Sequence, residues 1–101
     1  MNTIHKTNVF LSWLEKLKDR QGKVRILARV RSAAPGNFGG CEPVGDGVSE
    51  LRVHSGPGYR IYFGRKAARV YLLILGGDKQ SQERDIRRVK AMWRAIREGK
   101  Q

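Results

Sequence analysis

The stretch GPGYRIYFGRKAARVYLLIL, residues 56–75, decides which fold this chain can adopt. Turn residues at 55–58 separate two runs rich in aromatic and branched apolar residues, which is the pattern of a β-hairpin. A second turn is expected over residues 64–68. The run VYLLIL is apolar on both faces, which favours a position at the centre of a sheet. Together with the preceding residues 48–54, the stretch predicts an antiparallel meander of three strands: Val48–His54, Tyr59–Gly64 and Arg69–Leu75.

Apolar residues at helical spacing precede the meander. Residues such as Phe10 and Trp13 predict a helix over residues 8–18. A second helix is predicted over residues 19–33. Because only a few residues join the two helices, we expect them to form an antiparallel pair. A short strand over residues 2–6 is expected before them.

The segment between the helices and the meander, residues 35–47, is rich in glycine and proline. It predicts turns and one short edge strand around residues 42–44. After the meander, an apolar stripe at helical spacing predicts a last helix over residues 81–97. The predicted order is β-α-α-β-β-β-α. We therefore expect a single α+β domain over residues 1–101, in which a helical pair and a C-terminal helix pack on a small antiparallel sheet.

Composition places the chain among basic globular proteins. Its 101 residues and 40% hydrophobic content suffice for one core, and its net charge of +12 favours an anionic partner. A single cysteine, Cys41, forms no intramolecular disulfide, so a reducing cytoplasm is expected. Cys41, His5 and His54 lack metal-ligand spacing, so neither a metal nor a cofactor is expected. No apolar run approaches the roughly 20 residues of a membrane helix, so no membrane segment is expected.

Alternation along the first two strands of the meander separates polar from apolar residues. The two polar sets share one face only if the hairpin turn is centred on Gly56, with an odd-length loop or a bulge. In that register Arg52 lies opposite Arg60. The polar sets are expected to line an open surface, and they comprise Arg52, His54, Arg60 and Tyr62.

These residue types suit an RNA phosphate. Arginine presents a planar fork that matches phosphate oxygens, and aromatic rings give bases a stacking surface. The RNA 2′-OH is itself a nucleophile, so cleavage needs only a proton acceptor, cations that stabilise the transition state and a proton donor. Arg52 and Arg60 fit the cationic role, and the imidazole of His54 suits proton transfer near neutral pH. Taken singly, each of these residues is more often an ordinary surface residue.

Residues 47–93 resemble the toxins of type II toxin–antitoxin modules. The matching motifs are ELR at 50–52, GPGYRIYF at 56–63 and LLILGGDK at 72–79. The combination is similar to the RelE/ParE superfamily, within its HigB-like branch of addiction module killer proteins. This resemblance implies a RelE-like fold and a small bacterial toxin.

The resemblance also implies an activity and partners. Many members cleave mRNA in the ribosomal A site without a metal, and a cognate helix-turn-helix antitoxin neutralises them. The expected partners are therefore the antitoxin, the ribosome and mRNA, with operator DNA bound only through the antitoxin complex. By resemblance, Arg60 matches the transition-state arginine of the RNase members. Arg52 matches a basic residue on the neighbouring strand, and Lys79 falls near a third basic position.

The chain departs from several RNase members in its last helix. Those members place a tyrosine or histidine there or in the tail, whereas this chain has neither after Tyr71. Proton transfer is left to His54, Tyr59, Tyr62 or Asp85, or to ribosomal RNA and water. The candidate catalytic residues are Arg60, Arg52, Lys79, His54 and Tyr62, and the candidate RNA-binding residues are Tyr59, Arg65, Lys66, Arg69 and Arg84.

Two other functions fit the same sequence. One is a ParE-like toxin that inhibits DNA gyrase without catalysis, which the missing late acid–base residue favours. The other is an inactive remnant that binds an antitoxin or nucleic acid. DNA damage and filamentation with intact mRNA would mark the first, and the lack of growth arrest would mark the second.

Overall fold

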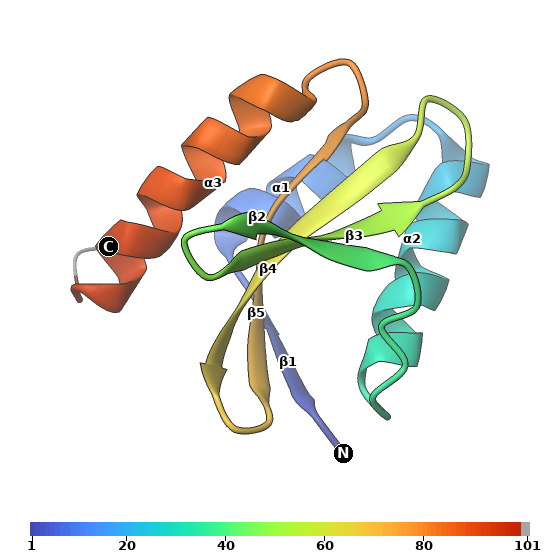
Figure 1. The fold of residues 1–101 in the computed structure, drawn as a ribbon. Helices are drawn as coiled ribbons and strands as arrows, with labels where there is room; N and C mark the ends of the chain where they lie inside the picture. Colours follow the sequence, from blue (N-terminus) through green and yellow to red (C-terminus); the bar gives the residue numbers. More distant parts are fainter. Residues whose placement is uncertain (100–101) are drawn as a thin grey trace.

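The computed structural model describes residues 1–99, which form three helices and a five-stranded mixed sheet (Figure 1). The predicted α+β class is confirmed. No helix within this range combines the length and the apolar character needed to cross a bilayer. The elements are β1 (Thr3–Lys6), α1 (Asn8–Lys16), α2 (Arg20–Ala33), β2 (Cys41–Gly45), β3 (Val48–Val53), β4 (Tyr59–Ala67), β5 (Val70–Asp78) and α3 (Gln82–Arg97).

The sheet has the strand order β1-β5-β4-β3-β2. Strands β2 to β5 form an antiparallel meander, which contains the three predicted strands and the predicted edge strand. Strand β1 pairs in parallel with β5, from Thr3 opposite Val70 to Lys6 opposite Leu73, so the sheet is mixed and not antiparallel. The central strand is β4, and the prediction that VYLLIL lies at the centre is wrong. That run is apolar on both faces because helices cover both faces of β5.

Strands β4 and β5 are longer than predicted, with nine residues each. The glycines that were expected to end or turn them lie inside the strands, where they make room for large side chains. A Cβ on Gly64 would lie 2.7 Å from the Trp93 indole, and one on Gly76 would overlap the ring of Trp13. The turn between these strands is consequently shorter than the predicted segment 64–68.

The first two helices begin at side-chain caps. The Thr7 hydroxyl accepts a hydrogen bond from the Phe10 amide, and the Asp19 carboxylate accepts one from the Gly22 amide. Helix α1 ends at Lys16, two residues earlier than predicted. Helix α2 turns away from α1 and does not run back along it, so the expected antiparallel pair is not formed (Figure 1).

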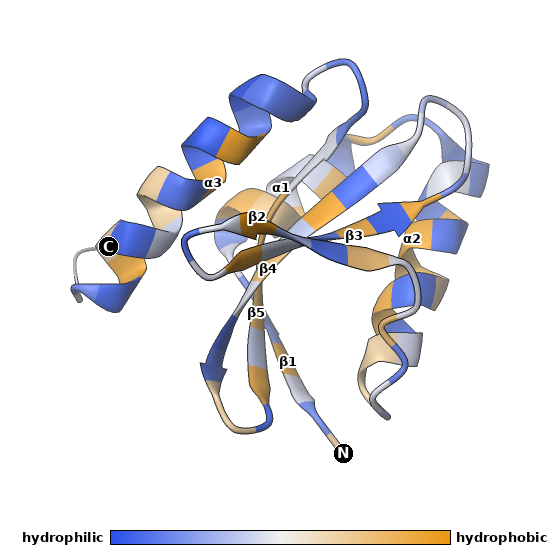
Figure 2. Ribbon diagram, in the orientation of Figure 1, coloured by the Kyte–Doolittle hydropathy of each residue, from blue (hydrophilic) through white to orange (hydrophobic). Residues whose placement is uncertain are grey.

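Each face of the sheet has its own core. Helices α1 and α2 cover one face, where Phe10 and Ile26 pack on Ile61. Helix α3 covers the other face, where Trp93 packs near Tyr62. Figure 2 shows mostly hydrophilic residues along α3, interrupted by the apolar positions that pack on the sheet. Much of each sheet face is thus covered by a helix.

Candidate anion-binding site

The β3–β4 hairpin has the register that the sequence predicts. Val53 pairs with Tyr59, which leaves a five-residue loop centred on Gly56. Arg52 lies directly opposite Arg60, so the two guanidinium groups leave the same face of the sheet. The odd loop length is allowed because Gly56 has a φ of 52° and Gly58, the last loop residue, a φ of 79°.

A cavity of about 530 Å³ lies at this end of the sheet. It is lined by the β3–β4 loop and by Arg52, His54, Arg60 and Lys79. These are four of the five candidate catalytic residues, and they come from β3, the loop, β4 and the segment after β5. Among the described residues that line the cavity, none carries a carboxylate. We call it the Arg60 cavity.

The side chain of Arg60 is held in place at the wall of this cavity and is only 12% exposed. Its Nη1 atom donates a hydrogen bond to the Gly58 carbonyl at 2.8 Å, and its Nε atom lies 4.0 Å from Glu50 Oε1. The Nε–H group is buried and has no hydrogen-bond partner within residues 1–99. A fixed guanidinium needs little reordering when it meets a phosphate.

Arg52 is paired with two carboxylates. Its Nε atom donates to Glu50 Oε2 at 3.1 Å, and its Nη2 atom donates to Glu42 Oε2 at 2.9 Å. The hydrogen bond to Glu50 and the charge of Glu42 raise the pKa of Arg52 above its ordinary value. Part of the positive potential of Arg52 is therefore already neutralised.

Glu50 is the site residue that sequence reasoning missed. It is 2% exposed, and besides Arg52 and Arg60 it meets Gln82, whose Nε2 atom donates to Glu50 Oε1 at 2.9 Å. Glu50 thereby links β3, β4 and the first turn of α3. The sequence did contain a sign of this role, because Glu50 lies two residues before Arg52 and therefore on the same face of β3. That face was expected to be open to solvent, but α3 covers it.

Tyr62 does not line an open surface, contrary to the prediction. Its side chain is completely buried beneath α3, and its hydroxyl has no hydrogen-bond partner in the described part of the chain. Burial raises the pKa of Tyr62, and the negative charges of Glu50 and Asp85 raise it further. The hydroxyl of Tyr62 is therefore not accessible at the surface of the protein.

Tyr59, a candidate RNA-binding residue, is largely buried although it is among the residues that line the Arg60 cavity. It is 5% exposed on the face covered by α1 and α2, with its ring 6.1 Å from that of Trp13. Its hydroxyl donates to Asp19 Oδ2 at 2.8 Å. Burial and this hydrogen bond raise the pKa of Tyr59 to about 12. The residue ties β4 to the start of α2.

The other candidate RNA-binding residues do not line the Arg60 cavity. Arg65, Lys66 and Arg69 are exposed near the β4–β5 turn, at the opposite end of the sheet from the β3–β4 loop (Figure 1). Arg65 and Lys66 line a separate cavity of about 270 Å³ together with Arg97. Arg84 is exposed on α3 and lines a third cavity.

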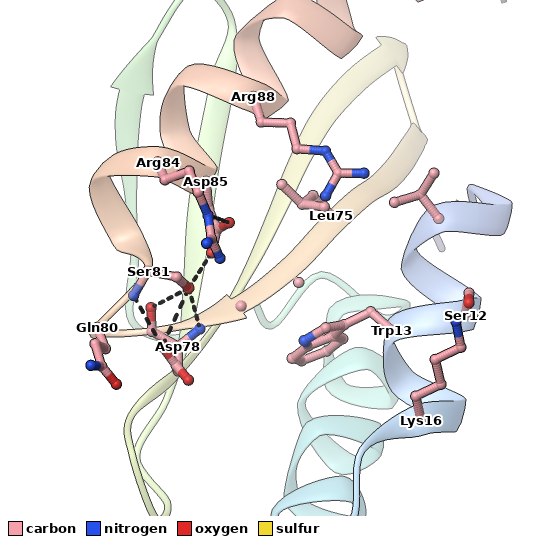
Figure 3. Close-up of a pocket in the computed structure, with 13 residues that line it drawn as sticks. Ser12, Trp13, Lys16, Leu75, Asp78, Gln80, Ser81, Arg84, Asp85 and Arg88 are labelled. Atoms are coloured by element: carbon pink, nitrogen blue, oxygen red, sulfur yellow. Dashed lines mark hydrogen bonds and ion pairs between the residues drawn. The ribbon is translucent and has the colours of Figure 1, made fainter.

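That third cavity, of about 680 Å³, lies between α1 and α3 (Figure 3). Asp85 is buried there and accepts a hydrogen bond from Ser81 Oγ at 2.5 Å, while Ser81 also bonds to Asp78. Trp13 faces this network from α1 (Figure 3). Two carboxylates in its wall make this cavity a poorer anion site than the Arg60 cavity.

Fold and site together define a small α+β protein with a cationic cavity at one end of a mixed sheet. The chain is 42% identical over 89 residues to an uncharacterized protein of Haemophilus influenzae, a match that covers 88% of this chain and 90% of the relative. The chain belongs to the same family as that protein. No family model matches the chain.

Proposed function

We propose that this chain is the toxin of a type II toxin–antitoxin module, of the RelE/ParE superfamily and its HigB-like branch. Its activity would be metal-independent, ribosome-dependent cleavage of mRNA. The observation that carries the proposal is the Arg60 cavity, in which Arg52, His54, Arg60 and Lys79 meet and none of the described lining residues carries a carboxylate. The mixed sheet with three helices is compatible with a RelE-like fold.

The proposed reaction uses the RNA as its own nucleophile. The 2′ oxygen loses its proton and forms a bond to the adjacent phosphorus, and the bond from phosphorus to the 5′ oxygen breaks. The leaving 5′ oxygen takes up a proton, so the products are a 2′,3′-cyclic phosphate and a 5′ hydroxyl. Arg60 and Lys79 stabilise the extra negative charge on the phosphate oxygens as the transition state forms.

Proton transfer falls to His54 in this proposal. Tyr59 and Tyr62 are buried, and Asp85 lines a different cavity. His54 is exposed at the rim of the Arg60 cavity, and histidine is the side chain that exchanges protons most readily near neutral pH. Ribosomal RNA or water supplies the second proton-transfer group.

The partners follow from the same proposal. The ribosome presents mRNA to the Arg60 cavity in the bacterial cytoplasm, and a cognate helix-turn-helix antitoxin blocks the toxin. The toxin reaches operator DNA only within the antitoxin complex. A net charge of +12 would speed its encounter with ribosomal RNA and with acidic segments of an antitoxin.

A second candidate is a ParE-like inhibitor of DNA gyrase. The burial of Tyr59 and Tyr62 favours it, because few acid–base groups remain near Arg60. The pairing of Arg52 with Glu42 and Glu50 favours it too, since that arginine is less available to a phosphate.

Brief expression in a bacterium separates the two candidates. The mRNA endonuclease predicts growth arrest with fragmented mRNA and normally supercoiled plasmid DNA. Growth arrest with intact mRNA and altered plasmid supercoiling would contradict the endonuclease and support the gyrase inhibitor. No growth arrest from a folded protein would contradict both and leave the inactive remnant.

A further inference from the structure

The Arg60 cavity shares lining residues with a second cavity. This neighbour has a volume of about 420 Å³ and lies between α2 and the end of β3. Arg52, Val53 and His54 line both cavities, so the two lie side by side around the end of β3, and we call them together the groove. The remaining lining residues of the second cavity are Arg25, Ala28, Arg29, Ser32 and Gly40.

The groove has a uniform sign of charge. No carboxylate is found among the described residues that line either cavity, although Glu42 and Glu50 pair with Arg52 from outside the groove. Two cavities beside α3 differ, since one contains Asp78 and Asp85 and another contains Asp46 and Glu98, whereas the small cavity lined by Arg65, Lys66 and Arg97 is also cationic. The groove is therefore a surface suited to an extended anion.

Two arginines of α2 form the far wall of the groove in different ways. Arg29 is fixed, because its Nε atom donates to the Arg52 carbonyl at 3.1 Å and its Nη2 atom donates to the Phe38 carbonyl at 2.9 Å. Arg25, one turn earlier, is exposed, and its side chain makes no hydrogen bond or ion pair with any residue in 1–99. Arg25 is thus available to a ligand in the second cavity.

The shape of the groove selects for a flexible polymer. Arg52 and Arg60 leave the sheet on the face covered by α3, whereas α2 packs on the other face. A ligand that fills both cavities must bend around the end of β3. A nucleic-acid duplex resists such a bend, since even DNA keeps its direction over roughly 50 nm, whereas a single strand bends easily.

We propose that the groove holds single-stranded RNA on both sides of the end of β3. The nucleotide next to the scissile phosphate lies against α2, and Arg25 binds its phosphate. This inference rests on the proposed function and names its substrate path. It makes Arg25 a binding residue, remote from the reacting atoms and separate from the candidate catalytic set.

The test is binding of a short fluorescent single-stranded RNA, with 2′-O-methyl groups that prevent cleavage, measured by anisotropy at several salt concentrations. Arg25→Ala should weaken binding on the order of threefold to fivefold, as expected for one exposed charge pair. It should also lower the salt slope by about 0.7, the value for one phosphate contact on a single strand. The matched control is Arg31→Ala, an exposed arginine of the same helix outside both cavities, which should bind like the wild type.

Each result decides the proposal. Weaker binding by Arg25→Ala alone supports it. Equal losses in both variants would show diffuse attraction only and would overturn it. Loss in Arg60→Ala with none in Arg25→Ala would also overturn it, and so would a failure of the wild type to bind. The proposed function is judged separately by mRNA cleavage in cells, so it survives if only the path over α2 is wrong.

Discussion

Glu50 and Arg60 show how single buried residues organise the candidate site. The Glu50 carboxylate lies between Arg52, Arg60 and Gln82, so one negative charge holds two arginines and the start of α3. Removing one partner of a buried charge pair leaves the other charge uncompensated, which is far more costly than losing an exposed pair. Glu50 is therefore a positioning residue, which holds the two arginines of the candidate site in place.

We predict that Glu50→Gln lowers the free energy of unfolding by about 2 kcal/mol, because the Arg60 guanidinium loses its buried counter-charge. Urea denaturation measures this loss. Glu42→Gln is the matched control: it also removes a partner of Arg52, but the Glu42 side chain is 62% exposed, so its loss should be clearly smaller. Equal losses in the two variants would contradict the role given to Glu50.

Tyr62→Phe should leave RNA cleavage unchanged and should raise the unfolding free energy by up to about 1 kcal/mol. The hydroxyl is buried without a hydrogen-bond partner among the described residues, and such a group is costly to bury. Cleavage assays and urea denaturation on the same preparation check both parts. A folded Tyr62→Phe protein without activity would show that the hydroxyl takes part in the reaction.

The pH dependence of stability at alkaline pH follows from Tyr59. Its folded-state pKa of about 12 lies above the ordinary value of 10.0, so ionisation of the phenol favours the unfolded state. The stabilisation is complete below pH 10 and is lost as pH rises toward 12. Tyr59→Phe should therefore flatten the fall in unfolding free energy between these pH values. The pKa of Tyr62 is raised as well, so this residue contributes a fall of the same sign. If the fall in unfolding free energy with pH were unchanged in Tyr59→Phe, it would have to come from other groups.

At the scale of elements, the sequence pattern predicted those features that depend on residues close together in the chain. The odd loop between β3 and β4 was predictable, because only that register puts Leu51 and Ile61 together in the core. The parallel pairing of β1 with β5 was not, since a four-residue strand carries no signal for its partner. The sequence also did not predict that α3 covers Glu50 and Tyr62. Alternation of polar and apolar residues assigns side chains to two faces of a strand, but it does not tell which face a helix distant in sequence will cover.

The glycines of β4 and β5 give a test at this scale. Gly64→Ala should lower the unfolding free energy by about 1–3 kcal/mol, because its Cβ would lie 2.7 Å from the Trp93 indole and push α3 from the sheet. Gly40→Ala is the matched control, since its Cβ would meet open space. Thermal unfolding compares the two. Equal midpoints would contradict the tight packing of α3 on β4.

At the scale of the whole molecule, the charge of the chain predicts an anionic partner but not the place where that partner binds. The net charge of +12 comes from cations spread over the surface, of which only a few line the groove. Arg65, Lys66 and Arg69 lie at the other end of the sheet, because the β4–β5 turn and the β3–β4 loop are at opposite ends of β4. Net charge alone could not distinguish the cations that line the groove from those elsewhere on the surface, which would attract an anionic ligand without fixing its position.

The number of cations in the groove predicts how strongly RNA binding depends on salt. If about four phosphates contact Arg25, Arg52, Arg60 and Lys79, the logarithm of the association constant for single-stranded RNA should fall with the logarithm of salt with a slope of about −3. Anisotropy titrations between low and physiological salt measure it. A slope near zero would contradict ionic contacts as the source of affinity.

The central claim is that this protein cleaves mRNA in the Arg60 cavity, where Arg60 stabilises the charge of the transition state. The most direct test maps mRNA 5′ ends in cells after a short pulse of wild type, Arg60→Ala or Arg65→Ala. The last variant is a control on the same strand, exposed and outside the Arg60 cavity. We predict new 5′ ends within translated codons for the wild type and Arg65→Ala, and none for a folded Arg60→Ala protein. Growth arrest without new 5′ ends, or undiminished cleavage by Arg60→Ala, would contradict the account.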